Sequence, residues 1–193
     1  MTATIDIVHT SVLAAETFEF LVPDDSKGFF IDATLGEGGH TDYFLKSNSK
    51  IRMAGVDADK RIMEVAARRL KSHGDRVVFY NTWFNQFFAS YPTELERPDG
   101  ILFDLGISTY HYEKGDRGFS FSRDEELDMR LEAGLELTAA DIVNNYPEEE
   151  LADIIFEYGE ERLSRRIARE IVAARAYERI GTSKQLADII WNA

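Results

Sequence analysis

The feature that most constrains this chain is a glycine-rich turn between a short apolar run and a helical pattern. In IDATLGEGGHTDYF (31–44), Gly36, Gly38 and Gly39 follow the apolar run directly. Glycine costs folding entropy, so three in four positions indicate a backbone that needs positive φ or close approach. Strand, glycines and helix together are typical of cofactor binding. Because Thr41 replaces the third glycine of G-x-G-x-x-G, a tight turn without a ligand stays open as the alternative.

Three further apolar runs resemble the run before the glycines. The predicted strands are residues 28–35, 51–58, 76–84 and 100–108. Helical patterns precede and separate them, at residues 11–22, 40–49, 59–74 and 85–91. Alternation of strands and helices requires parallel strands joined by right-handed crossovers. The sequence therefore predicts an α/β fold with a parallel sheet for residues 1–110.

The pattern changes after residue 110. Residues 111–137 are polar and turn-rich, which predicts a loop with functional potential. From residue 138 onward the pattern is helical throughout, which predicts a separate all-helical domain over 138–193. The predicted helices begin at a Thr138 cap, at Pro147 as the first helical residue, at residue 160 and at a cap near residue 182.

Several predicted strands end in residues suited to a ligand. Asp32, Asp57, Phe84 and Asp104 stand at or near the four strand ends, which parallel strands bring to one edge. A carboxylate at the end of the second strand, such as Asp57, can accept both hydroxyls of an adenosine ribose. The alternative is that Asp57 or Asp59 caps the following helix.

Composition excludes several classes of protein and site. The chain has no cysteine, which removes disulfides and thiolate metal sites and fits a reducing compartment. No stretch has the length of a membrane span and the N-terminus has no signal-peptide pattern, so we expect a cytoplasmic protein. The formal net charge of −13 argues mildly against nucleic-acid binding.

Together these motifs resemble the MraW family of ribosomal RNA small-subunit methyltransferases (RsmH). The generic part of the resemblance is the glycine loop, and the specific part lies further along the chain. The matching stretches are HTSVL (9–13), IDATLGEGGH (31–40), GVDAD (55–59), DGILFDLGIS (99–108), DRGFSFSRDEELDMR (116–130), EELADIIFEYGEERLSRRIAREIVAAR (149–175) and TSKQLADII (182–190). The resemblance implies a Rossmann-like class I methyltransferase core with an inserted helical domain.

The resemblance also implies an activity, methyl transfer from S-adenosyl-L-methionine to N4 of a cytidine in the decoding centre of 16S ribosomal RNA in the small subunit. The implied cofactor contacts are Gly36, Gly38, Gly39, His40, Asp57, Phe84, Asp104 and His111. The His111 contact is the least secure, because the family often has proline and glutamine where this chain reads Ser-Thr-Tyr-His at residues 108–111. No metal is expected.

Catalysis requires an acceptor for the amine protons of the cytosine, because positive charge develops on N4 during transfer. Asp104 and Ser108 are the predicted catalytic residues. A target base in folded RNA must be unstacked, and Phe119, Phe121 or Tyr110 is predicted to stack on it. Packing of these rings onto the core is the alternative.

Two groups of arginines are candidates for RNA contact. Arg117, Arg123 and Arg130 lie in the loop that follows the sheet, and they are the predicted RNA-binding residues. A second group with helical spacing consists of Arg162, Arg165, Arg166 and Arg169. For this second group, pairing with Glu160, Glu161 and Glu170 on a solvated face is the alternative.

Family members continue well beyond the length of this chain, with further strands expected to complete the sheet. The predicted function is therefore open to two alternatives, an NAD-dependent oxidoreductase and a non-catalytic module that binds S-adenosylmethionine or RNA. The oligomeric state is also open, with a homodimer as one alternative.

Overall fold

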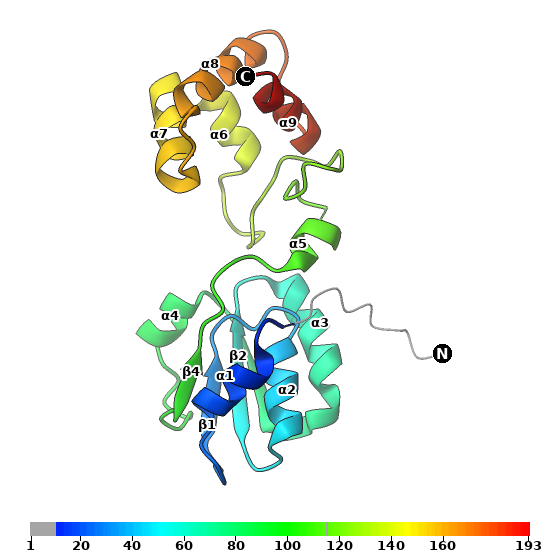
Figure 1. The fold of residues 1–193 in the computed structure, drawn as a ribbon, viewed down its shortest axis with the longest axis vertical. Helices are drawn as coiled ribbons and strands as arrows, with labels where there is room; N and C mark the ends of the chain where they lie inside the picture. The colour runs from blue at the N-terminus through cyan, green and yellow to red at the C-terminus, as the bar shows by residue number, and fades with distance from the viewer. Residues whose placement is uncertain (1–10, 115) are drawn as a thin grey trace, which may run out of the picture. The chain divides into compact units, whose positions relative to one another are not determined.

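The computed structural model describes residues 11–114 and 116–193. They form two compact units that divide between Tyr110 and His111. Each unit has its own hydrophobic core, and each is described by itself (Figure 1). In the part of the chain that the structure describes, no helix has the length and apolarity needed to cross a bilayer.

The first unit is built on a four-stranded parallel sheet with the order β3-β2-β1-β4. Its strands are β1 (Phe29–Asp32), β2 (Arg52–Asp57), β3 (Val77–Asn81) and β4 (Gly100–Leu102). In the register, Asp32 lies opposite Gly55 and Leu102, and Asp57 lies opposite Asn81. The predicted α/β fold with a parallel sheet is confirmed, and β1 lies in its interior.

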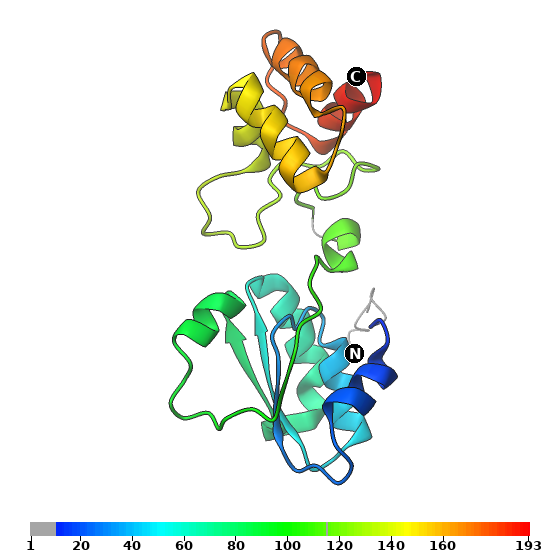
Figure 2. The same ribbon diagram turned by 60° about the vertical axis from the view of Figure 1, so that its left-hand side comes forward.

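Helices cover both faces of this sheet. They are α1 (Ala14–Leu21), α2 (Gly39–Ser47), α3 (Lys60–Leu70), the 3-10 helix η1 (Lys71–Arg76) and α4 (Phe84–Ala89). Two views show α1, α2 and α3 on one face and α4 on the other (Figures 1 and 2). The strands supply both cores by alternation, because Phe30 and Met53 pack toward α2 and α3 whereas Ile31 and Val56 pack toward Phe87 of α4.

The second unit is helical around a core of its own. Its helices are α6 (Ala139–Asn145), α7 (Glu148–Gly159), α8 (Ser164–Arg175) and α9 (Ser183–Asn192), and α5 (Thr109–Lys114) crosses the boundary between the units. Leu127 from the preceding segment is buried with Leu151 and Ile171 in this core. Thr138 and Thr182 each form a reciprocal capping box at the start of α6 and α9, which confirms both predicted caps.

Four local predictions were wrong, each for a physical reason. Strand β4 ends at Leu102 and not at residue 108, because the Asp104 N–H donates to the Thr34 hydroxyl and not to a neighbouring strand. The predicted loop begins with α5, where the Ser108 hydroxyl accepts a hydrogen bond from the Tyr110 N–H at 3.2 Å. Pro147 precedes α7 as its N-cap, because its ψ of 150° is not helical. Strand β3 ends at Asn81, whose side chain donates to the carbonyl of Asp57.

Candidate functional site

The glycine turn is tied to the end of β2 by the Asp57 carboxylate. One Asp57 oxygen accepts a hydrogen bond from the Gly36 N–H at 2.9 Å, and the other accepts from the Asp59 N–H at 2.8 Å. Gly36 has a φ of 53°, a conformation that favours glycine. The turn after β1 and the end of β2 therefore form one hydrogen-bonded structure at the carboxyl edge of the sheet.

The structure shows which of the two aspartates near the end of β2 caps the following helix. Asp59 is the N-cap of α3 and accepts a hydrogen bond from the Arg61 N–H at 2.9 Å. Asp57 is the last residue of β2 and precedes the cap. The structure therefore gives the helix cap to Asp59 and leaves Asp57 at the strand end where the sequence pattern predicted it.

The three glycines are required for different reasons. A Cβ on Gly38 would lie 2.9 Å from Cδ1 of Leu70, and a Cβ on Gly39 would collide with the Ser11 hydroxyl. Those two glycines allow close packing within the protein itself. A Cβ on Gly36 would meet no atom closer than 4.0 Å. Gly36 is therefore the one of the three whose Cβ position is not filled by the protein itself.

Asp32 is buried at the end of β1 and connects the turn to β4. Its carboxylate accepts hydrogen bonds from the Thr41 hydroxyl at 2.8 Å and from the Thr34 N–H at 3.3 Å. The Thr34 hydroxyl in turn accepts from the Asp104 N–H at 2.7 Å. Burial raises the pKa of Asp32 to about 6. This network fixes the backbone position of Asp104 relative to the glycine turn.

The side chain of Asp104 is half exposed and lies beside His40. The Nε2–H of the buried His40 donates to the Val12 carbonyl at 2.9 Å, so its Nδ1 is the atom that faces the carboxylate. Nδ1 lies 3.9 Å from an Asp104 oxygen. His40, at the start of α2, thus contacts both the Val12 carbonyl, two residues before α1, and the carboxylate after β4. Of the N-terminal motif HTSVL, His9 and Thr10 lie outside the described residues.

An aromatic surface lies near the same edge of the sheet. Phe84 and Phe103 meet edge to face with ring centroids 5.4 Å apart, and both rings are partly exposed. The sequence pattern predicted that Phe84 would end the third strand. Phe84 is instead the first residue of α4, because β3 ends three residues earlier, at Asn81. A partly exposed ring next to a polar turn is suited to contact a flat aromatic base.

The remaining predicted catalytic and cofactor residues, Ser108 and His111, lie near the start of α5. Ser108 lies just before α5, where its hydroxyl accepts the Tyr110 N–H. His111 belongs to the second unit, where its buried ring packs against Phe119 with centroids 5.4 Å apart. Its contact with a cofactor stays a prediction. Phe119 thus follows the packing alternative, whereas Phe121 is largely exposed.

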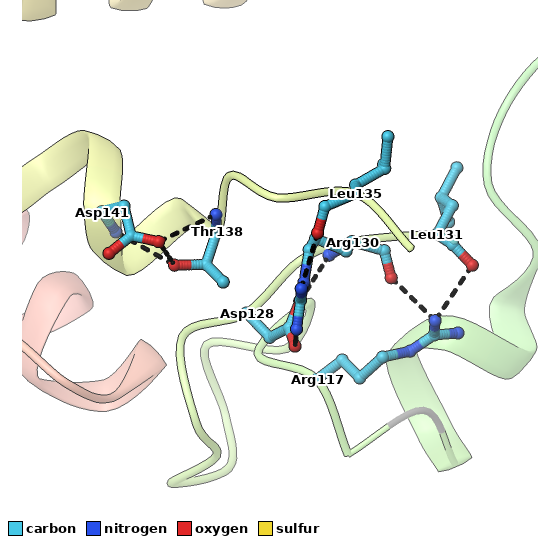
Figure 3. Close-up of polar contacts among 7 residues, drawn as sticks. All are labelled: Arg117, Asp128, Arg130, Leu131, Leu135, Thr138 and Asp141. Atoms are coloured by element: carbon cyan, nitrogen blue, oxygen red, sulfur yellow. Dashed lines mark hydrogen bonds and ion pairs between the residues drawn. The ribbon is translucent and has the colours of Figure 1, made fainter. Parts of the chain in front are cut away.

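The arginines that were predicted to bind RNA hold the segment 116–137 together (Figure 3). Arg117 is buried, and its Nη1 donates to the carbonyls of Arg130 and Leu131 at 2.7 and 3.1 Å. Arg130 forms a two-pronged pair with Asp128 at 2.7 and 2.8 Å, and its Nη1 donates to the Leu135 carbonyl. This pairing lowers the pKa of Asp128.

Arg123 has a similar arrangement. Its guanidinium donates to the backbone carbonyls of Glu113 and Tyr112 and pairs with a Glu125 oxygen at 2.6 Å. The other Glu125 oxygen accepts from the Gly118 N–H at 3.0 Å. The three arginines therefore have structural roles in the segment, and their contact with RNA stays a prediction.

Comparison with known proteins identifies the family. The model of the MraW methylase family matches residues 6–193 of this chain. The chain belongs to the MraW methylase family. This confirms the resemblance that the sequence motifs indicated.

Curated relatives carry the name Ribosomal RNA small subunit methyltransferase H. The protein of that name from Treponema denticola is 55% identical over 186 residues, which are 96% of this chain and 59% of the relative. The Nostoc punctiforme protein is 45% identical over 94% of this chain and 58% of the relative. The Mycobacterium avium protein is 40% identical over 97% of this chain and 52% of the relative. The chain thus spans less than two thirds of these relatives.

Sequence reasoning missed two residues at the edge of the sheet. Thr34 carries the link to Asp104, and Asn81 donates to the carbonyls of Asp57 and Ala58 at 2.9 and 3.1 Å. Polar residues are common at strand ends and in turns, and no sequence spacing shows which of them form a hydrogen bond to a distant residue. In the structure, parallel pairing of β2 and β3 places Asn81 opposite Asp57.

Proposed function

We propose that this chain binds S-adenosylmethionine at the carboxyl edge of its sheet. We further propose that, as part of a methyltransferase, it transfers the methyl group to N4 of a cytidine in the decoding centre of 16S ribosomal RNA. The observation that carries the proposal is the turn between β1 and α2, held open at Gly36 by Asp57. Its relatives are named for the small-subunit ribosomal RNA, which supports the choice of substrate.

The residues at this edge fit the parts of the cofactor. Asp57 would accept the ribose hydroxyls, and the ring of Phe84 would contact the adenine. The turn at Gly36, Gly38 and Gly39 would place main chain against the ligand, with His40 and Asp104 beside it. A carboxylate at the edge of the sheet also favours a cationic ligand over a neutral product. When bound, S-adenosylmethionine supplies an activated methyl group on a sulfonium.

The chemistry asked of the protein is mainly positioning. The N4 lone pair of cytosine is delocalised into the ring, so the amine must be held about 3 Å from the methyl carbon and in line with the leaving sulfur. Asp104 would accept a hydrogen bond from the amine as its charge develops, with Ser108 as a second acceptor. The Thr34 hydroxyl fixes the Asp104 backbone, which keeps that acceptor in register with the glycine turn.

The proposal is tested in two steps with the 193-residue chain and with a version extended to the length of its relatives. Calorimetric titration should show micromolar binding of S-adenosylmethionine. Labelled methyl transfer is then measured on small ribosomal subunits that lack the modification, with Asp104→Ala as the variant that should lose transfer. Titration with NADH tests the oxidoreductase alternative. Binding without transfer by either version would leave a binding module and remove the enzymatic proposal.

A further inference from the structure

The outward face of α8 carries a stripe of arginines. Arg162 stands in the turn before the helix, and Arg165, Arg166 and Arg169 follow at helical spacing. At 100° per residue the three arginines within the helix fall within about a third of its circumference. The buried residues of the helix lie on the opposite side, at Ser164, Ile167, Ala168 and Ile171. The three guanidinium groups are therefore carried on the face away from the core, and Arg162 is exposed in the turn before them.

Within the described residues, three of these four arginines have no acidic partner. Arg165 pairs with Asp153 of α7 at 2.6 Å. Among the described residues, no carboxylate lies within 4.0 Å of the charged nitrogens of Arg162, Arg166 or Arg169, and all three side chains are exposed. Glu161 instead accepts the Leu163 N–H at 2.7 Å. The alternative considered from the sequence, in which these arginines pair with the neighbouring glutamates, is therefore not what the described residues show.

The arginines also oppose the intrinsic preference of the helix. The N-terminal end of a helix carries a partial positive charge, so acidic side chains are favoured in its first turn and cations are disfavoured. The first turn of α8 contains no acidic residue and two arginines, Arg165 and Arg166. Helix stability therefore does not explain these residues. An external anion would be attracted both by their charges and by the helix end.

An exposed aromatic ring accompanies the stripe. Tyr158 near the end of α7 is 84% exposed and precedes Arg162 by four residues. Helices α7 and α8 lie side by side in both ribbon views, joined by the pair between Arg165 and Asp153 (Figures 1 and 2). Arginine planes with an exposed aromatic ring are a combination that RNA-binding surfaces use for phosphates and unstacked bases.

We infer that the α8 stripe, defined as Arg162, Arg166 and Arg169, is a surface that binds RNA phosphates, and that the exposed Tyr158, four residues before Arg162, supplies an aromatic ring for a base. The inference rests on the proposed function, since it names the part of the chain that would hold the RNA substrate. It moves the RNA contact from the arginines of the segment 116–137, whose donors are already engaged, to arginines that have no acidic partner in the part of the chain that the structure describes. The strongly acidic chain as a whole would repel RNA, so a localised basic face is what such a substrate requires.

The test measures RNA affinity as a function of salt. The probe is a fluorescein-labelled transcript of the decoding-centre stem of 16S ribosomal RNA. Its anisotropy is followed between 50 and 300 mM KCl, over which the Debye length falls from about 14 Å to about 6 Å. The variant Arg162→Gln/Arg166→Gln/Arg169→Gln should weaken binding at least about tenfold at low salt. It should also reduce the slope of log Kd against log salt by about 2, since each phosphate contact contributes roughly 0.7 to 0.9.

A matched control removes the same number of charges elsewhere. Lys71→Gln/Arg179→Gln/Lys184→Gln changes the net charge equally, and Arg179 and Lys184 already have acidic partners. This control should keep the salt slope. The variant Arg162→Lys/Arg166→Lys/Arg169→Lys keeps the charges and should also keep it. Glutamine and lysine have helix propensities close to that of arginine, so all three variants should fold.

Each outcome supports or overturns the inference. A stripe variant that binds RNA like the unmodified chain, or that loses no more than the control, would overturn it. So would an unmodified chain that does not bind the transcript at all. A polyglutamate peptide that competes as well as RNA would assign the stripe to an acidic protein and contradict RNA as the partner. Calorimetry with S-adenosylmethionine is run on every variant, so a failure of the cofactor site is seen separately from a failure of the stripe.

Discussion

The glycine turn after β1 and the segment 116–137 both carry polar motifs, but the polar side chains of the two regions have different partners. In the turn, the Asp57 carboxylate accepts the Gly36 N–H and the Asp104 carboxylate is half exposed. In the segment, Arg117 and Arg130 direct their donors to backbone carbonyls and to Asp128. The buried carboxylate in the turn has a raised pKa, at Asp32, whereas the paired carboxylate in the segment, Asp128, has a lowered one.

This difference separates two kinds of sequence signal. The topology of a parallel sheet decides where a strand end lies. A residue at a predicted strand end can therefore be placed at the carboxyl edge of the sheet without knowledge of its neighbours. The charge of a residue in a loop does not predict its partner, because an arginine fork binds backbone carbonyls and a nearby carboxylate as well as it binds phosphate. The arginines of the segment therefore hold its own backbone together, whereas the residues of the turn lie at the sheet edge where the strand pattern predicted them.

The largest expected effect breaks the rigidity of the segment. Gly118 has a φ of 80°, and a Cβ there would lie 2.5 Å from the Glu126 carbonyl oxygen and 3.1 Å from Cα of Leu127. Gly118→Ala should reduce the free energy of unfolding of the second unit by about 3 kcal/mol, from backbone strain and overpacking. Hydrogen exchange in residues 117–129 measures the loss.

Gly134→Ala is the control for that prediction, since its nearest neighbour would be a Glu132 oxygen at 3.5 Å. We expect a change within about 0.5 kcal/mol. Equal protection of the segment in both variants would show that it is not built as tightly as its contacts indicate.

The next effect concerns the buried carboxylate at the turn. The pKa of Asp32 is raised to about 6 in the folded chain, so between about pH 4 and 6 the native state binds more protons than the unfolded state. This group therefore lowers stability as pH rises through that range, by about 3 kcal/mol at most. Asp32→Asn should be more stable than the unmodified chain at pH 7, and the advantage should shrink toward pH 4. Urea unfolding at both values measures it, with the exposed Asp25→Asn as control.

A smaller effect of opposite sign is expected in the segment. Arg130 lowers the pKa of Asp128, so this group stabilises the folded chain above its unfolded pKa and the stabilisation is lost as pH falls through the folded pKa. Asp128→Asn should cost about 1 kcal/mol at pH 7 and less below pH 4. Unfolding curves at pH 7 and pH 3 give the comparison. A penalty that persists unchanged at pH 3 would contradict a charge-based role.

The smallest effect is expected on the surface of the helical unit. The pair between Arg165 and Asp153 joins two exposed side chains. Arg165→Gln should change the free energy of unfolding by less than about 0.5 kcal/mol, because exposed ion pairs are weak. A thermal melt is sufficient, and a loss above about 1 kcal/mol would mean that Arg165 has a structural role like that of the segment arginines.

The fold was predictable from the sequence to a large extent, and the site only partly. Periodicity gave the four strands and the helices around them, and the caps at Thr138 and Thr182 follow from local hydrogen bonding. Asp57 was predictable because a strand end has a defined place in a parallel sheet. The link from Thr34 to Asp104 and the forks of Arg117 and Arg130 were not, because these contacts join residues by tertiary geometry that no periodicity encodes.

The central claim is that the turn at Gly36 receives S-adenosylmethionine, and two glycines of the first unit allow a direct test. Gly36 and Gly74 have φ values of 53° and 58°, and a Cβ on either would meet no atom closer than 4.0 Å. Alanine should cost folding stability at both positions, and more at Gly74, because its ψ of −133° lies outside the left-handed helical region. Calorimetric titration with S-adenosylmethionine should show affinity reduced at least about tenfold in Gly36→Ala, where the methyl group enters the space for the ligand, and unchanged in Gly74→Ala. Equal affinities for the two variants would contradict the account.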